Sequence, residues 1–407
     1  MRFLLPRVLR PVAFLAVLAS CADGGAAPAL GPVEPISSPA AAPSGEPFLT
    51  ATRDGRILLS WLEQLPDTSV GFRFAAWDGR TWTEPRNIVA RRDFFVNWAD
   101  FPSILELPDG RLATHWLQRE GPDTYAYGVR ITTSADAGVT WSEPLAPHTD
   151  GTLTEHGFVS LFPDGQDLGA VWLDGRNMGG GHGHGGGDMT IRFARLTADG
   201  TRMDETEIDA RACECCQTDV ALTDEGPIVA YRDRSPEEVR NIVVSRRANG
   251  AWTAPTPVHD DAWTLPGCPV NGPAIVAAGR DVAVAWFSAP GDVAQVKVVF
   301  SADAGATFGA PVRIDDGDPA GRVDLLLLDD GGVLVSWIER TDGGAAVRAK
   351  RVTRDGRAGA AIDVAASSAE RASGFPRMAR AGDGVMFAWT EPGQPARVRL
   401  ARVALSP

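Results

Sequence analysis

The sequence predicts an all-β protein folded as a β-propeller of four-stranded blades, seven in number, with six as the alternative. The first observation is a repeat in which an apolar strand, a turn and a second strand end on an aromatic residue. Seven copies are present: Phe48–Trp61, Phe101–Trp116, Phe158–Trp172, Thr218–Tyr231, Gly272–Trp286, Arg322–Trp337 and Phe375–Trp389. Their closing aromatic residues recur every 51 to 59 residues. That period matches one propeller blade.

The second observation is a third apolar strand in every repeat, followed by a turn rich in Asp, Asn and Gly. These third strands are Phe72–Ala76, Tyr127–Thr132, Thr190–Leu196, Ile242–Arg246, Val296–Phe300, Val347–Val352 and Val398–Val403. The third is composition, since 44 Gly and 30 Pro indicate many turns. A short fourth strand completes each repeat except the last. We expect Val33–Ile36 to supply that strand and close the ring, which removes a free sheet edge.

The N-terminus has the features of an export signal. Basic residues precede a short apolar run, Val12–Leu18, and small residues then lead to Cys21. The string Leu18–Cys21 resembles the lipobox of bacterial lipoproteins, in which the Cys becomes the lipidated first residue. An ordinary secretory signal with an incidental Cys is the alternative. Ala22, rather than Asp, follows the Cys, as in lipoproteins of the outer membrane.

Three regions are therefore expected. Residues 1–20 form a lipoprotein signal peptide, residues 21–46 an Ala/Pro/Gly-rich tether from lipidated Cys21, and residues 47–407 a single propeller. The protein is expected to be exported and held at the bacterial cell envelope by its lipid anchor alone, as a monomer. A net charge of -13 and a pI near 5.0 exclude a nucleic-acid partner, which needs a basic face.

Two turns carry a motif of a known family. Ser134–Trp141 and Ser301–Phe308 both match S-x-D-x-G-x-T followed by Trp or Phe. This pattern resembles the Asp-box, or BNR repeat, of the sialidase superfamily. We expect the Asp to accept backbone N–H bonds, the Gly to take positive φ, and the aromatic residue to pack the hairpin onto its blade. These motifs therefore indicate the fold and not a site.

In a propeller, the loops that enter the first strands and those that join second to third strands open on one face. Polar residues gather in these loops and predict a site at that mouth, although a mouth can also be polar because it is wet. The candidate catalytic residues are Asp100, Glu155, His156 and Tyr125. The candidate ligand-binding residues are Asp174, Arg176, Arg232, Asp233, Arg234, Arg240, Asn271, Arg322 and Arg377.

The resemblance implies a glycan or another small anionic ligand at the mouth and requires no cofactor. Sialidases grip a sugar carboxylate with three arginines, and they use a Tyr–Glu nucleophile pair and an Asp acid/base. An enzyme of this type would be an exo-sialidase. The Arg-Ile-Pro motif of the family is absent, however, and six blades is its usual number. Tyr125 is the candidate for an exposed tyrosine, because Tyr231 stands at a packing position.

Four cysteines set the sequence apart: Cys213, Cys215, Cys216 and Cys268. In an exported protein, disulfides are the first expectation, for example one to Cys268 across adjacent blades. The alternative is a copper or zinc site in a metal-binding or redox protein, with His182 and His184 nearby. A non-catalytic interaction scaffold is the third hypothesis, because fold does not determine chemistry.

Overall fold

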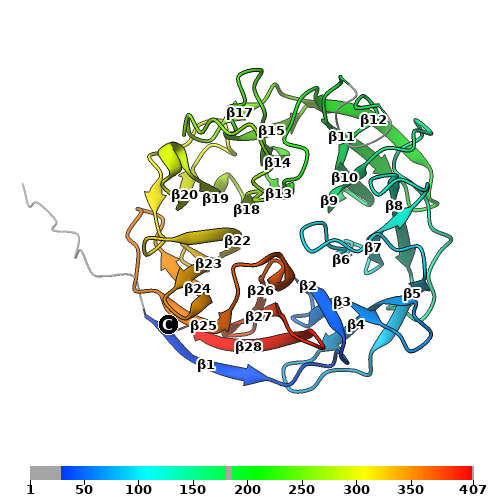
Figure 1. The fold of residues 1–407 in the computed structure, drawn as a ribbon, viewed down its shortest axis with the longest axis horizontal. Coiled ribbons are helices and arrows are strands. Elements are labelled where there is room, and N and C mark those ends of the chain that lie inside the picture. The colour runs from blue at the N-terminus through cyan, green and yellow to red at the C-terminus, as the bar shows by residue number, and fades with distance from the viewer. Residues whose placement is uncertain (1–28, 180–185, 406–407) are drawn as a thin grey trace, which may run out of the picture.

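The computed structural model describes residues 29–179 and 186–405. They form seven antiparallel sheets arranged in a ring (Figure 1), so the all-β, seven-bladed propeller prediction is confirmed. The signal peptide and Cys21 lie outside the described residues. Helical elements in the described ranges are two single 3-10 turns, η1 (Pro290–Asp292) and η2 (Arg371–Ser373), and none could cross a membrane.

The blades follow one another along the chain. Blade 1 contains β2 (Ser44–Ala51), β3 (Ile57–Gln64), β4 (Val70–Trp77) and β5 (Arg86–Arg91). Blade 2 contains β6 (Ile104–Glu106), β7 (Leu112–Arg119) and β8 (Tyr127–Ser134). Blade 3 contains β9 (His156–Asp164), β10 (Asp167–Asp174), β11 (Thr190–Leu196) and β12 (Arg202–Asp209). Blade 4 contains β13 (Asp219–Thr223), β14 (Gly226–Arg232), β15 (Ile242–Ala248), β16 (Ala251–Trp252) and β17 (Thr256–Pro257).

Three further blades complete the ring. Blade 5 contains β18 (Ala274–Ala278), β19 (Asp281–Ser288), β20 (Gln295–Ser301) and β21 (Val312–Arg313). Blade 6 contains β22 (Pro319–Leu327), β23 (Val333–Thr341), β24 (Gly344–Val352) and β25 (Ile362–Ser367). Blade 7 contains β26 (Arg377–Ala381), β27 (Gly384–Glu391), β28 (Arg397–Leu405) and β1 (Leu30–Ile36).

The ring closes through β1, which pairs with the last strand of the chain. Val33 lies opposite Val403 and Ile36 opposite Leu400, so the outer strand of blade 7 comes from the opposite end of the sequence (Figure 1). The expected closure is confirmed. The expected boundary at residue 47 is wrong, because strand structure begins at Leu30, inside the segment assigned to a tether. Its apolar residues find a partner only when the ring forms.

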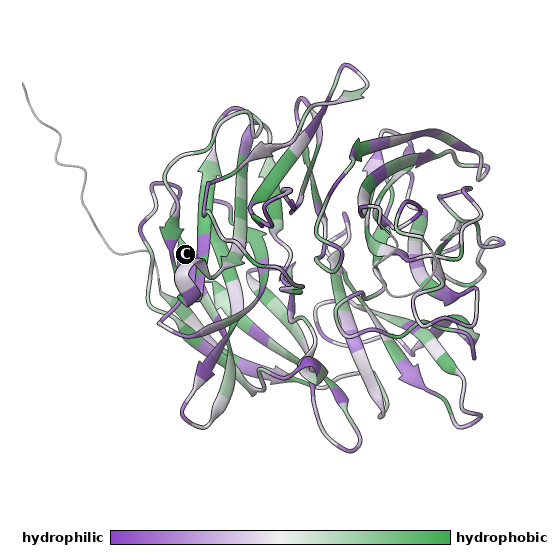
Figure 2. Ribbon diagram, turned by 45° about the horizontal axis from the view of Figure 1, so that its top comes forward, coloured by the Kyte–Doolittle hydropathy of each residue, from purple (hydrophilic) through white to green (hydrophobic). Residues whose placement is uncertain are grey.

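The core lies between neighbouring blades, and the closing aromatic residues fill it. All seven are buried on the second strands: Trp61, Trp116, Trp172, Tyr231, Trp286, Trp337 and Trp389. Trp172, for example, packs with Ala113 and Leu117 of the preceding blade. Hydrophobic residues accordingly follow the strands, and hydrophilic residues gather in the connecting loops (Figure 2). Burial on both faces makes the second strands near-continuous apolar runs.

In both S-x-D-x-G-x-T turns the Asp side chain accepts backbone N–H bonds from within the turn, as expected. The Oδ1 atom of Asp136 accepts N–H bonds from Val139 at 3.1 Å and Thr140 at 2.8 Å, and Gly138 has a φ of 81°. Trp141 packs against a cluster that contains Ile104 and Leu112 of its own blade, as expected. It also meets Phe74 of the preceding blade edge-on, with ring centroids 6.0 Å apart, because blades bury their faces against each other.

Gly138→Ala is expected to destabilise the protein more than Gly55→Ala does. Both glycines have φ near 80°, so both alanines would be strained by roughly 1–2 kcal/mol. A Cβ at Gly138 would also lie 2.2 Å from Cζ of the buried Phe74 ring, whereas at Gly55 it would meet nothing within 4 Å. The clash adds roughly 1–3 kcal/mol. Denaturant unfolding measures the difference, and equal losses in the two variants would contradict this packing.

Candidate functional site

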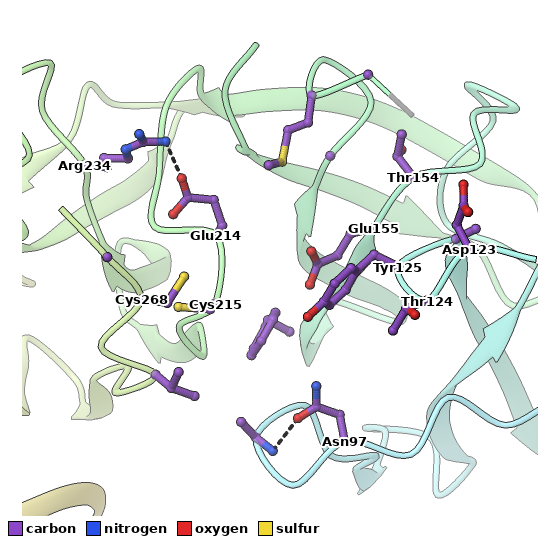
Figure 3. Close-up of a pocket in the computed structure, with 18 of the residues that line it drawn as sticks. Asn97, Asp123, Thr124, Tyr125, Thr154, Glu155, Glu214, Cys215, Arg234 and Cys268 are labelled. Carbon is purple, nitrogen blue, oxygen red and sulfur yellow. Dashed lines mark hydrogen bonds and ion pairs between the residues drawn. The ribbon is translucent and has the colours of Figure 1, made fainter. Parts of the chain in front are cut away.

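One cavity of about 670 Å³ opens at the mouth of the ring (Figure 3). Its walls come from loops that enter first strands, at 97–99, 153–158, 214–215 and 266–270. They also come from loops that join second to third strands, at 123–126, 175–179 and 234–240. These are the two loop types expected to share a face. They belong to blades 2 to 5, and Arg371 of η2, before the first strand of blade 7, also lines the cavity.

A cluster of three acidic groups stands on the blade 2 and 3 side. The Tyr127 hydroxyl donates to Glu155 Oε1 at 2.6 Å, and Asp100 Oδ2 lies 3.5 Å from the same hydroxyl. Asp100 Oδ1 also accepts the Phe158 N–H at 2.8 Å. Gly157 permits this approach, because a Cβ there would lie 2.1 Å from the Asp100 carboxylate.

Burial changes the proton affinity of all three groups. Burial raises the pKa of Glu155 to about 7, although the hydrogen bond from Tyr127 opposes the rise. Burial, and then the charge of Glu155, hold the pKa of Asp100 well above its usual range. Burial likewise raises the pKa of Tyr127. Among the three, Glu155 lines the cavity and can exchange a proton with a ligand near neutral pH.

Tyrosine is therefore present beside the candidate carboxylate, but at a different position from the one expected. Tyr125, 44% exposed, lines the cavity near Glu155 (Figure 3). The hydrogen bond to Glu155 comes instead from Tyr127, which is fully buried and stacked on Phe95 at 3.8 Å. Tyr125 lies in the turn before β8, whereas Tyr127 is the first residue of the strand and is buried in the core between blades.

A network of four charges forms the opposite wall. Arg234 bonds Glu214 (Figure 3). It also donates to Glu238 at 2.7 Å. Arg240 donates to Glu214 at 3.1 Å and to Glu238 at 2.7 Å. Each of these two guanidiniums therefore faces two carboxylates, and their positive charge is balanced within the protein. Sequence reasoning did not single out Glu214, whose partners lie 20 and 26 residues away.

His156, Asp174 and Arg176 do not reach the cavity, and the expectation that they do is wrong. Arg176 donates through two nitrogens to Asp174, each at 2.7 Å. His156 is buried and lies 3.2 Å from Asp150 Oδ1, with its ring stacked 3.9 Å from His148. Burial lowers the pKa of His156, but Asp150 and Asp174 outweigh that effect and raise it. These charges satisfy one another inside the protein.

Three residues of blades 4 and 5 expected to bind ligand also have internal partners. Arg232 is 1% exposed and donates to the backbone carbonyls of Asn271, Arg240 and Phe287. Asn271 accepts the Arg322 N–H at 2.6 Å. Asp233 accepts the Arg234 N–H at 2.7 Å and does not line the cavity. The prediction that these three residues bind a ligand at the mouth is wrong, because their polar atoms bond to neighbouring loops.

Arg322 and Arg377 are likewise held inside the ring rather than at the mouth cavity. Arg322 donates to Ser373 Oγ at 2.5 Å and lies 4.8 Å over the Trp98 ring. Burial lowers the pKa of its guanidinium to about 10. Arg377 pairs with Asp324 at 3.2 Å, and with Asp100 it lines a second cavity of about 280 Å³. Neither position supports a shared grip on a carboxylate at the mouth.

The four cysteines come together as the sequence suggested. Sγ of Cys213 lies 2.8 Å from Sγ of Cys216 and 3.9 Å from Sγ of Cys215. Cys268 stands beside Cys215 at the cavity wall (Figure 3). Burial favours a higher pKa for the Cys213 thiol, but hydrogen bonds from Cys215 and Cys216 and the charge of Arg232 hold that pKa well below its usual range.

The remaining candidates for a metal site, His182 and His184, lie outside the described residues.

No family model matches the sequence, and no curated protein matches it. Among solved structures, the polysaccharide lyase Uly1 aligns at a TM-score of 0.55 and 12% identity, over 89% of this chain and 90% of the lyase. A puromycin-hydrolysing peptidase of Mycobacterium tuberculosis aligns at 0.52 and 12% identity. This alignment covers 91% of this chain but only 54% of the peptidase.

A mutant of the NanB sialidase from Streptococcus pneumoniae aligns at 0.43 and 12% identity, over 89% of this chain and 68% of the sialidase. At such identities the likeness shows the fold alone. The expected β-propeller fold is confirmed by the strand topology and by the alignment with the lyase. Activity has to be argued from the site.

Proposed function

We propose that the protein binds a glycan in the mouth cavity and that Glu155 transfers a proton to or from it. The observation that carries the proposal is the Glu155 carboxyl itself. It lines a cavity of about 670 Å³, accepts the Tyr127 hydroxyl at 2.6 Å, and has a pKa raised to about 7 by burial. A group with that pKa can act as acid or base at neutral pH.

The proposed roles differ along the cluster. Glu155 exchanges the proton with the ligand, and Tyr127 is a positioning residue whose O–H holds the carboxylate in place. Cleavage of a glycosidic bond, by hydrolysis or by elimination, needs such a proton transfer. The existence of a polysaccharide lyase with the same fold supports a glycan ligand only by analogy.

The cavity wall favours a glycan that is not gripped through a carboxylate by three arginines. Arg234 and Arg240 face the cavity already paired with Glu214 and Glu238. An incoming carboxylate would have to displace those partners at two of the three arginines that line the cavity, Arg371 being the third. We therefore propose a ligand bound mainly through hydroxyl groups, with Tyr125 offering ring surface at the cavity.

Glu155→Gln is expected to lower kcat on a glycan substrate by about 100-fold or more, because the amide cannot exchange a proton. The measurement is release of reducing ends or unsaturated sugars from a panel of neutral, uronic-acid and sialylated polysaccharides. In the wild-type protein the plot of rate against pH should have an inflection near pH 7, where Glu155 gains or loses its proton. Glu143→Gln, at an exposed position away from the cavity, is the matched control and should retain full activity.

Tyr127→Phe supplies a second readout. The Tyr127 hydroxyl lowers the pKa of Glu155, so its removal should move the inflection in the plot of rate against pH to higher pH. Full activity of Glu155→Gln, or no binding and no turnover of any polysaccharide by the wild-type protein, would refute the proposal.

A further inference from the structure

The four cysteines form a compact cluster built from two neighbouring blades. The thiol cluster comprises Cys213, Cys215, Cys216 and Cys268. The ligand atoms of the first three all lie within 4.8 Å of one another. Figure 3 shows the sulfur of Cys268, from the loop that enters β18, beside the sulfur of Cys215. Two of the thiols are buried, and the other two border the mouth cavity.

The surrounding backbone holds this arrangement in place. The Gln217 side chain donates to the Ala99 carbonyl at 2.5 Å and accepts the Gly272 N–H at 2.9 Å. A Cβ on Gly272 would lie 2.1 Å from the Gln217 carbonyl, so the two cysteine loops press directly against each other. The Cys213 N–H is bonded to the Arg232 carbonyl at 3.0 Å. The sulfurs are thus brought together before any ligand arrives.

The charge beside the cluster indicates which chemical state it takes. Arg232 is 1% exposed and donates only to backbone carbonyls, and within the described part of the chain no carboxylate pairs with it. Its one further partner is the Trp263 ring, 5.1 Å from the guanidinium. A buried cation requires a compensating anion. Disulfides are neutral and would leave it uncompensated, whereas thiolates would balance it.

We propose that the thiol cluster binds one thiophilic d10 metal ion, Zn²⁺ or Cu(I), through thiolates. Each ligand thiol releases its proton to solvent as its sulfur–metal bond forms, and no electron is transferred. Sulfurs around a tetrahedral zinc stand about 3.8 Å apart, because each bond is about 2.3 Å long. The 3.9 Å between Cys213 and Cys215 matches this spacing, and the closer Cys213–Cys216 pair would open on binding. Soft thiolates select both ions over harder ones.

The first test counts thiols, and it needs no variant within the cluster. The parent is the full chain with Cys21→Ser, which leaves four thiols of the five cysteines. After anaerobic preparation and removal of reductant, we expect alkylation of all four. One equivalent of Zn²⁺, or separately of Cu(I) in competition with a chromogenic chelator, should protect them. The unsubstituted chain is the control and should bind the same single equivalent.

Variants at the two cavity-facing positions give the second test. Cys215→Ser and Cys268→Ser should each weaken binding of the preferred ion by at least about 100-fold, exceeding the usual loss for an outer-shell change. The separate titrations tell which ion is preferred. Failure of both ions to protect the parent's thiols would overturn the proposal, as would two stoichiometric disulfides in protein isolated without reductant. Neither result would affect the glycan proposal, which rests on Glu155.

Discussion

A chain that begins at Ser37 should lose much of its stability and associate with other copies. The deletion removes β1, whose apolar residues Leu30, Val33 and Ile36 pack partly buried against blade 7 and its neighbours. Partial burial of each is worth roughly 1–2 kcal/mol, so the loss approaches about 3–6 kcal/mol before strand pairing is counted. That is a large share of the roughly 5–15 kcal/mol that folds a typical protein.

Deletion also exposes β28 as a new edge strand. Exposed edges pair with other chains, so we expect association as well as a lower unfolding midpoint. Thermal unfolding and size-exclusion chromatography measure the two effects. A chain that begins at Ala29 keeps every pair between β1 and β28 and should match the intact protein in both measurements. If the chain that begins at Ser37 were equally stable and monomeric, closure through β1 would not support the ring.

Asp174→Asn is expected to lower the free energy of unfolding by roughly 1.5–3 kcal/mol, because it weakens charge-assisted hydrogen bonds in a buried network. Arg176 keeps Glu205 and His156 keeps Asp150 as partners. Asp174 is fully buried and accepts hydrogen bonds from Trp172 at 2.8 Å and from two nitrogens of Arg176. His156 also lies 3.7 Å away. The amide keeps the shape of the side chain, so the loss reports charge and hydrogen bonding rather than a cavity.

A matched control is Asp54→Asn. Its ion pair with Arg56, 2.7 Å long, is exposed, so we expect a change of roughly 0–1 kcal/mol. Burial opposes ionisation of Asp174, but Arg176 and His156 hold its pKa below the usual range. Its contribution is therefore present above about pH 4 and is lost only as the pH falls through the lower folded value. Urea unfolding at pH 7 and in acid measures both effects, and similar losses in the two variants would contradict the role of burial.

The blades could be predicted from the sequence because their signals are local. A second strand that is buried on both faces must be apolar throughout, and its closing aromatic residue marks each repeat, from Trp61 to Trp389. The Asp136 turn could also be predicted, because its hydrogen bonds span only a few residues. The extent of blade 7 was harder to predict from the sequence. Strand β1 pairs with residues at the other end of the chain, and its sequence looks like a linker.

The site was predicted in outline only. The loops that line the mouth followed from topology, and Glu155, Arg234 and Cys215 do border the cavity. Arg176 and Arg322 looked equally available in sequence but are bonded inward. A polar residue in a mouth loop can face a ligand or a neighbouring loop, and composition does not distinguish the two cases.

The sequence by itself determined a propeller of seven repeats and which loops share its mouth, because strand alternation, turn chemistry and period all lie within short stretches. Only the tertiary structure decided which residues of the mouth loops line the cavity and can contact a ligand. Tyr127 meets Glu155 across 28 residues and a blade boundary, and Arg322 meets Ser373 across 51. Pairing at that range depends on how neighbouring blades pack, and it settles where each buried charge finds its partner.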